Sequence, residues 1–211
     1  MLNPTVAHLP PISMVANVDR LVMSASDYLA WEAEQSIRHE YFHGAAYAMV
    51  GGTLAHNAIA LNIASWLRGQ LRGTGCRAYM ADAKVQISPV GPYFYPDGVV
   101  TCDDRDRQAT SLISYPKLII EVLSPSTAGF DRGDKFKAYR RLPSLREYLL
   151  VDATQVSVDR YYRNSLNQWI LTSYPAVEQD QETDWEAIAV NLESLELTAS
   201  LGMIYEEVQL L

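Results

Sequence analysis

The run KLIIEVL at residues 117–123 is apolar at every position after Lys117 except Glu121. A continuous apolar run of this length is typical of a central β-strand that is buried on both faces. A carboxylate in such a strand is costly when it is ionised and unpaired, so Glu121 needs a base, a hydrogen-bond network or a metal ion as its partner. The run therefore predicts the centre of a sheet and a buried polar group within it.

The residues that follow this strand predict one helix and three further strands. The helix extends from Asp131 to Leu142, where Pro143 ends it. Runs rich in aromatic and β-branched residues then indicate strands at residues 147–151, 156–162 and 169–174, the last two joined by a turn at 164–167.

The residues that precede the strand add two helices and several extended segments. Ser24 or Ser26 caps a first helix that reaches Gln35. A longer helix, with apolar residues at helical spacing, runs from Thr53 to Arg72. This order of helices and strands predicts an α/β or α+β sheet covered by helices rather than a regular βαβ repeat. Extended segments are expected at residues 40–50, 77–80, 84–88 and 93–101.

Length and composition favour one globular unit with appended segments. Of the 211 residues, 48% are apolar and 20% are charged, which is enough for one substantial core and excludes a disordered or fibrous protein. We divide the chain into an N-terminal arm at residues 1–20, a main domain at 21–177 and an acidic C-terminal extension at 178–211. We expect the extension to pack on the domain or on a dimer partner.

The two cysteines, Cys76 and Cys102, do not indicate a disulfide framework, and the N-terminus lacks the pattern of a secretory signal. No stretch approaches the ~18 uninterrupted apolar residues that a membrane-spanning helix requires. We therefore expect a cytoplasmic protein with no membrane partner.

Charge is distributed unevenly along the chain. Residues 1–177 hold all 17 Lys and Arg residues and 16 acidic residues, whereas residues 178–211 hold nine acidic residues and no base. The formal charge of −8 therefore belongs to the tail, and the body is close to neutral. A near-neutral body lacks the basic stripe that is typical of proteins that bind long DNA.

Asp97 and Glu121 are the main candidates for a metal site. They are predicted on neighbouring strands, where two carboxylates suit a hard cation such as Mg²⁺. Asp97 lies between Pro96 and Gly98, so it also fits the alternative role of an ordinary turn residue.

Lys135 is the candidate positive charge on the helix after the central strand. At ~100° per residue it lies in the middle of the apolar face, with Asp131 and Tyr139 on the same side. Lys137 lies on the opposite side, which faces solvent. An inward-facing lysine requires a carboxylate partner or a task, because burial disfavours its charge. An ion pair with Asp131 is the purely structural alternative.

His56 and Glu40 are further polar candidates. His56 lies near the centre of the apolar face of the long helix, where it is either a satisfied core histidine or part of a site. Glu40 lies beside His39 and His43, but the cysteines or additional histidines that a zinc site needs are missing. The absence of a phosphate-cradling glycine-rich loop, a Gly-x-Ser-x-Gly elbow and a Rossmann fingerprint disfavours nucleotide hydrolysis and serine esterase chemistry.

Together these residues resemble the Uma2 family of restriction endonuclease-like proteins, within the PD-(D/E)XK nuclease superfamily. The resemblance spans about residues 24–174. It rests on Pro96-Asp97, on EVLSPST at residues 121–127, on the spaced Asp131, Lys135 and Tyr139, and on EYLLVD at residues 147–152.

The resemblance implies a mixed central sheet flanked by helices, with extra strands towards the C-terminus. It also implies that Asp97 and Glu121 bind Mg²⁺ or Mn²⁺ and that a lysine orients the attacking water. The superfamily pattern places this lysine two residues after the acid, where this chain has Leu123. In this family Lys135, on the following helix, matches the lysine, and Lys84 on a preceding strand is the alternative donor.

Within this resemblance Glu40 is an accessory ligand or an orienting acid, and His56, Asp131 and Tyr139 support the site. Our leading hypothesis is a metal-dependent endonuclease that hydrolyses phosphodiester bonds in DNA. We expect a homodimer, since cutting two strands suits two active sites. A second hypothesis is a binding or regulatory module that keeps the nuclease fold but does not cleave. A third makes the buried charges a structural ion-pair network.

Overall fold

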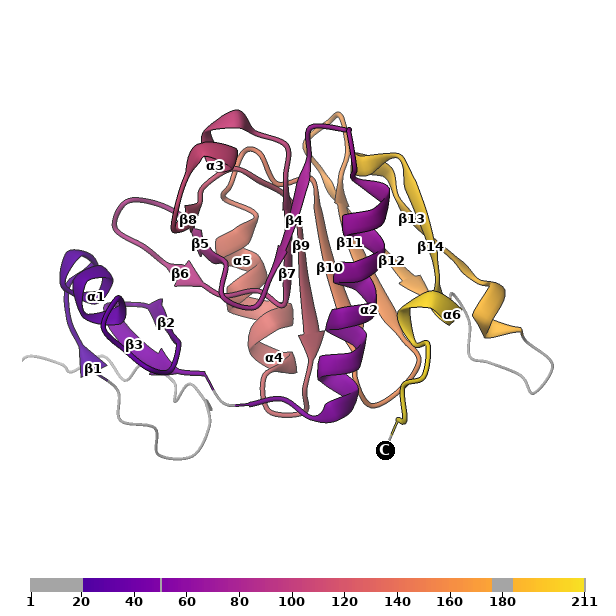
Figure 1. Cartoon of the computed structure of the whole chain (residues 1–211), viewed down its shortest axis with the longest axis horizontal. Helices are drawn as coiled ribbons and strands as arrows, with labels where there is room; N and C mark the ends of the chain where they lie inside the picture. The colour runs from indigo at the N-terminus through magenta and orange to yellow at the C-terminus, as the bar shows by residue number, and fades with distance from the viewer. Residues whose placement is uncertain (1–20, 50, 176–183, 211) are drawn as a thin grey trace, which may run out of the picture.

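The computed structural model describes residues 21–49, 51–175 and 184–210. The predicted N-terminal arm at residues 1–20 lies outside the described residues. Within the described ranges the chain forms two six-stranded sheets and a separate two-stranded sheet, with helices packed around them (Figure 1). No helix in these ranges is long and apolar enough to cross a membrane.

The central sheet is built around the predicted apolar strand, β9 (Pro116–Leu123), both of whose faces are buried. β9 pairs in parallel with β10 (Glu147–Asp152) and antiparallel with β7 (Gly98–Thr101). This combination is the mixed sheet that the resemblance implied, and the predicted fold class is confirmed. The strand order is β12-β11-β10-β9-β7-β4, where the remaining members are β4 (Arg77–Met80), β11 (Val158–Arg163) and β12 (Trp169–Tyr174).

Helices cover both faces of the central sheet (Figure 1). α2 (Leu54–Gln70), capped by the Thr53 hydroxyl, packs against Ile120 and Val122 of β9. The helix after β9 lies on the other face, over Ile119. Because side chains alternate along a strand, Glu121 points to this second face together with Ile119.

The helix after β9 differs from its prediction at both ends and in its hydrogen bonding, since its last helical residue is Tyr139 rather than Leu142. It begins at Ala128 rather than Asp131, and it comprises α4 (Ala128–Phe130), a π-helical segment (Asp131–Lys135) and α5 (Phe136–Tyr139). π-Helical turns are rare and are often found at functional sites. The helical-wheel prediction nevertheless placed Asp131 and Lys135 correctly, since both are buried.

A second sheet packs on the α5 side of the central sheet. Phe94, from this sheet, lies in edge contact with Tyr139 of α5, with ring centroids 5.2 Å apart. This packing brings β2 towards the face of β9 that carries Glu121. The order is β1-β3-β2-β6-β5-β8, with β1 (Leu21–Val22), β2 (His39–Phe42), β3 (Ala45–Ala48), β5 (Lys84–Gln86), β6 (Tyr93–Phe94) and β8 (Leu112–Ile113). Two short helices are α1 (Ala25–Glu32) and α3 (Asp104–Gln108).

The described part of the acidic extension packs on the chain's own body, beside α2 (Figure 1). Val190 and Leu201 are fully buried in the core that includes α2. The Tyr205 hydroxyl donates to the carbonyl of Asp152, at the end of β10, over 2.9 Å. The extension contains a 3-10 helix (Trp185–Ala187), β13 (Ala189–Leu192), a second 3-10 helix (Glu193–Leu195), β14 (Leu197–Ser200) and α6 (Leu201–Ile204).

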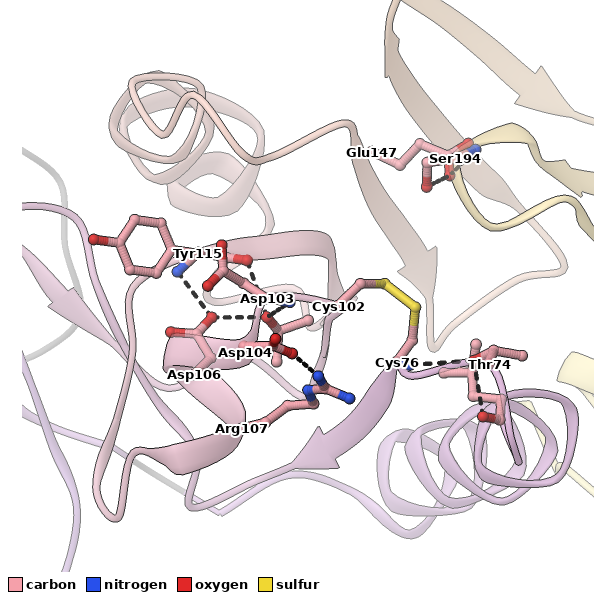
Figure 2. The surroundings of a disulfide bond; sticks show 12 residues. Thr74, Cys76, Cys102, Asp103, Asp104, Asp106, Arg107, Tyr115, Glu147 and Ser194 are labelled. Carbon is pink, nitrogen blue, oxygen red and sulfur yellow. Dashed lines mark hydrogen bonds and ion pairs between the residues drawn. A yellow bond between two sulfur atoms is a disulfide. The ribbon is translucent and has the colours of Figure 1, made fainter.

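Cys76 and Cys102 form a disulfide bond, although the two cysteines did not indicate a disulfide framework in the sequence (Figure 2). β4 pairs antiparallel with β7 so that Arg77 lies opposite Thr101. The next residues outward are the two cysteines, whose Cα atoms are 4.0 Å apart. No sequence pattern indicated this pair, because the strand register, and not the spacing along the chain, brings the thiols together.

Glu147, at the start of β10, ties the extension to the central sheet. Its side chain is fully buried and accepts hydrogen bonds from the backbone N–H groups of Glu193 and Ser194, at 3.0 and 3.1 Å, and from the Ser194 hydroxyl (Figure 2). Arg160 lies 3.6 Å from the same carboxylate. Burial raises the pKa of Glu147, although the bonds from Ser194 and the charge of Arg160 oppose that rise.

We expect loss of the disulfide to lower the free energy of unfolding by about 2–4 kcal/mol, because the bond restricts the unfolded chain between the two cysteines. Urea denaturation with and without dithiothreitol measures the difference. The Cys76→Ala/Cys102→Ala variant is the control, and reductant should leave it unchanged. Equal stability of oxidised and reduced wild type would contradict the prediction.

Glu147→Ala should lower the free energy of unfolding by about 3–5 kcal/mol, because it leaves the part-buried donors of Glu193 and Ser194 without their acceptor and removes the buried carboxylate beside Arg160. Glu147→Gln keeps an acceptor and should lose less. Because the folded pKa is raised, wild type should gain stability relative to Glu147→Gln as pH falls from neutrality towards the ordinary glutamate pKa of about 4.3. Denaturation curves across that range would refute this if the difference stayed constant.

Candidate active site

The Lys135 ammonium lies at the centre of a buried group of carboxylates. Its Nζ atom is 3.0 Å from Glu40 Oε1, 3.0 Å from Glu121 Oε1 and 3.4 Å from Asp131 Oδ1. The lysine is only 5% exposed. Each acid comes from a different element, since Glu40 lies on β2, Glu121 on β9 and Asp131 on the helix of the lysine itself. We call these four residues the Lys135 cluster.

Carboxyl groups outnumber the single lysine three to one in the Lys135 cluster. Burial raises the pKa of Glu121 well above its ordinary value and also raises that of Glu40, while the nearby Lys135 opposes both shifts. Burial alone would lower the pKa of Lys135, but Glu121, Glu40 and Asp131 outweigh it and hold that pKa well above its ordinary value. The lysine is therefore charged at neutral pH, and the cluster can accept further positive charge.

Aromatic hydroxyls and a backbone amide fix the positions of these groups. The Tyr139 hydroxyl donates to Glu121 Oε1 over 3.0 Å. The backbone N–H of Tyr95 donates to Glu40 Oε1 over 3.1 Å, and the Tyr148 hydroxyl donates to the carbonyl of Asp131 over 2.9 Å. The position of Tyr139 on the inward face of the helix predicted its role from the sequence. The role of the Tyr95 amide could not be predicted, because every residue except proline carries a backbone N–H group.

Asp97 and His56 form a second polar pair beside the Lys135 cluster. His56 Nε2, on α2, is 2.8 Å from Asp97 Oδ1, and the backbone N–H of Val122 donates to Asp97 Oδ2 over 2.7 Å. The hydrogen bond to Asp97 raises the pKa of His56. Asp97 precedes the last β7–β9 pair, Gly98 opposite Ile120, so the continued register places it opposite Glu121.

The structure brings Lys135, and not the alternative Lys84, to the carboxylates. The Lys84 ammonium lies over the rings of Tyr28 and Tyr95, at 5.1 and 5.5 Å from their centroids, and burial lowers its pKa. Nor does Glu40 join the neighbouring histidines, since His39 Nδ1 lies 3.0 Å from Glu32 Oε2. Lys135 is therefore the lysine that tertiary packing places beside Glu121.

The donor chemistry of this region fits a hard divalent cation. In the described part of the chain, no group of three or more histidine, cysteine or acidic side chains is already arranged around one metal position. Mg²⁺ nevertheless binds proteins through one or two carboxylates, with waters and substrate phosphates as its other ligands. Asp97 and Glu121, with the surplus negative charge of the cluster, meet that requirement.

The chain is similar to one protein family and to a solved nuclease-like structure. Residues 25–200 match the Uma2 family, which is described as "Putative restriction endonuclease". Two Synechocystis proteins are related in sequence. The first, slr1290, is 39% identical over 183 residues, covering 87% of this chain and 91% of its own length. The second, sll1609, is 32% identical over 153 residues, covering 72% and 86%.

The structural likeness extends over most of the chain. A crystal structure of a "putative nuclease belonging to DUF820" from Anabaena variabilis superposes with a TM-score of 0.70. It covers 87% of this chain and 97% of its own, at 17% sequence identity. At this level of identity the likeness establishes the fold.

We expect Lys135→Met to lower the free energy of unfolding by about 3–5 kcal/mol, because it leaves three carboxylates buried without their cation. Lys135→Met/Glu121→Gln should recover part of the loss, since it removes one of those charges. Lys137→Met, on the exposed side of the same helix, is the matched control and should change stability by less than about 0.5 kcal/mol. Urea denaturation followed by circular dichroism measures all three, and wild-type stability in Lys135→Met would refute the prediction.

Proposed function

Because the chain belongs to the Uma2 family of restriction endonuclease-like proteins, we propose that it is a divalent-metal-dependent endonuclease that hydrolyses phosphodiester bonds in DNA. The observation that supports this most directly is the contact of the buried Lys135 with Glu121, which lies opposite Asp97 in the continued register of β7 and β9. A lysine and two carboxylates beside two neighbouring interior strands of a mixed sheet are the groups that the resemblance assigns to metal binding and water activation. We propose Asp97 and Glu121 as the ligands of Mg²⁺ or Mn²⁺.

Each remaining residue of the site has a proposed task that follows from its contacts. His56 and the Val122 amide orient the Asp97 carboxylate, and Tyr139 orients that of Glu121. Lys135 places a positive charge where it can orient the attacking water or the scissile phosphate. A bound divalent cation would supply Lewis acidity, which offsets the negative charge that develops on a phosphodiester.

Glu40 and Asp131 set the charge of Lys135. They lie on the second sheet and on the lysine's own helix, and both contact its ammonium. We propose that Glu40 is an accessory ligand or an orienting acid and that Asp131 supports the lysine. We also propose that residues 21–177 form the nuclease domain, that the extension from residue 178 covers it, and that two copies act together on two strands.

A second candidate is a module that keeps the fold but does not cleave. It is favoured by the contacts of the Lys135 cluster, because Glu121 and Lys135 already satisfy each other. It is also favoured by the near-neutral body of the chain. The same contacts support a purely structural role. Measurements of metal binding and cleavage, and not the geometry of the site, therefore distinguish the nuclease from the non-cleaving module.

The first test is metal binding. We expect calorimetry to detect saturable Mn²⁺ binding to wild type, and we expect Glu121→Gln and Asp97→Asn to abolish it, because each removes one anionic ligand. Asp134→Asn removes a carboxylate that makes no hydrogen bond or ion pair with the candidate site among the described residues, and it is the matched control. Circular dichroism establishes that each variant is folded. Unchanged affinity in both site variants would refute the proposed ligands.

The second test is cleavage. Wild type should nick plasmid or cut single-stranded DNA in the presence of Mg²⁺ or Mn²⁺, and Lys135→Met should lower the rate about a hundredfold or more, whereas Lys137→Met should not. If the folded wild type neither binds metal nor cleaves DNA, the nuclease proposal is overturned in favour of the non-cleaving module.

A further inference from the structure

A basic pocket lies at the C-terminal end of α5, away from the candidate active site. It is an open cavity of about 530 Å³ between the loop that follows α5, the start of β10 and the hairpin of β11 and β12. We call it the arginine pocket. Its lining includes Arg140, Arg141, Arg146, Arg163, Asn167 and Trp169.

The four arginines of this pocket have no acidic partner among the described residues. Among the other described arginines, Arg68, Arg72 and Arg77 likewise form no ion pair, whereas Arg132 pairs with Asp159 and Arg160 with Glu193. In the described ranges, by contrast, no carboxylate oxygen lies within 4.0 Å of a pocket guanidinium. Four positive charges are therefore concentrated at one place on a body that is close to neutral overall. Such a concentration attracts anions.

Arg163 is a buried side chain of the pocket lining, held in place by several contacts. It is only 7% exposed, and its guanidinium lies 4.6 Å from the centroid of the Trp169 ring. It donates to the carbonyl of Leu142 over 3.1 Å and to that of Arg140. Its Nε is buried without a hydrogen-bond partner in the described structure. Burial and the nearby charge of Arg146 lower its pKa, as expected of a cation held beside a like charge.

Stabilisation of the helix explains only part of this arrangement. Positive side chains near a helix C-terminus interact favourably with the helix dipole, which accounts for Arg140 and Arg141. It does not account for Arg146, which precedes β10, and the bonds of Arg163 leave its Nε unsatisfied. Guanidinium groups are well suited to phosphates, because their parallel N–H donors match two phosphate oxygens.

We propose that the arginine pocket binds the phosphate backbone of a nucleic-acid strand, apart from the candidate active site. The backbone N–H of Arg146 donates to the carbonyl of Lys117 at the beginning of β9. Glu121 lies four residues further along that strand, about 13 Å away at roughly 3.3 Å per residue. One strand could therefore contact both places. This inference extends the proposed function, but phosphate binding at the pocket requires neither metal nor cleavage.

The test is binding of a short fluorescein-labelled oligodeoxynucleotide, measured by fluorescence anisotropy in EDTA. We expect Arg140→Ala/Arg141→Ala/Arg146→Ala to weaken binding about tenfold or more and to reduce the slope of log Kd against log salt by about 2, because three phosphate contacts are lost at about 0.7 each for a single strand. The corresponding triple lysine variant keeps the three charges and should keep the salt slope, while it should lose part of the affinity because an ammonium group lacks the paired donors of a guanidinium group. Arg68→Ala/Arg72→Ala removes two exposed charges from the α2 region and should bind like wild type.

Further arms separate this proposal from the alternatives. Arg163 is left intact, so that its bonds to the helix end are preserved, and circular dichroism establishes that each variant is folded. Because binding is measured in EDTA, where no metal-dependent cleavage takes place, strand binding is kept distinct from the proposed catalysis. Wild-type affinity and salt slope in the alanine triple variant would overturn the proposal, even if the protein cleaves DNA. Displacement by inorganic phosphate at concentrations as low as those of the oligonucleotide would also overturn it, in favour of a free-anion site.

Discussion

The buried contact between Lys135 and its three carboxylates is the constraint on which the arrangement of the molecule depends. It joins β2 of the second sheet, β9 of the central sheet and the π-helical turn in a single ionic group. Ions in an apolar interior need partners, because water is not available to stabilise them. The second sheet and the helix after β9 must therefore keep a fixed position relative to the central strand. Apolar packing of Phe94 on Tyr139 reinforces the same arrangement.

The contact between Lys135 and its carboxylates affects both the stability of the fold and the capacity of the site to bind cations. Three carboxylates around one lysine leave a surplus of negative charge in a buried place, which is unfavourable for a group whose only purpose is structural. An excess of carboxyl groups is, by contrast, suited to a site that binds a cation or a proton during a reaction. Asp97, paired with His56, adds a further carboxylate opposite Glu121 on the neighbouring strand. This excess of acids distinguishes the candidate site from an ordinary buried ion pair.

The distribution of charge in this protein indicates its candidate binding surfaces better than the net charge of −8 does. The acidic extension dominates the net charge, yet its described part packs on the body through Glu147 and α2 and does not face the arginine pocket in any described contact. The pocket concentrates four guanidinium groups, while the candidate site concentrates carboxylates around Lys135. Folding therefore separates the two signs of charge into two places, which is the distribution that a protein acting on a polyanion with a cation would need.

The sequence by itself determined the central strand, the long helix, the mixed fold class and the inward faces of Lys135 and Tyr139. These features follow from periodicity, which is a local property, and from the family motif. Only the tertiary structure decided that Glu40 meets Lys135, because β2 belongs to another sheet. It also decided the pairing of Cys76 with Cys102, through the register of β4 and β7. Contacts between distant segments depend on how sheets pair and pack, and a pattern read along one chain does not contain that information.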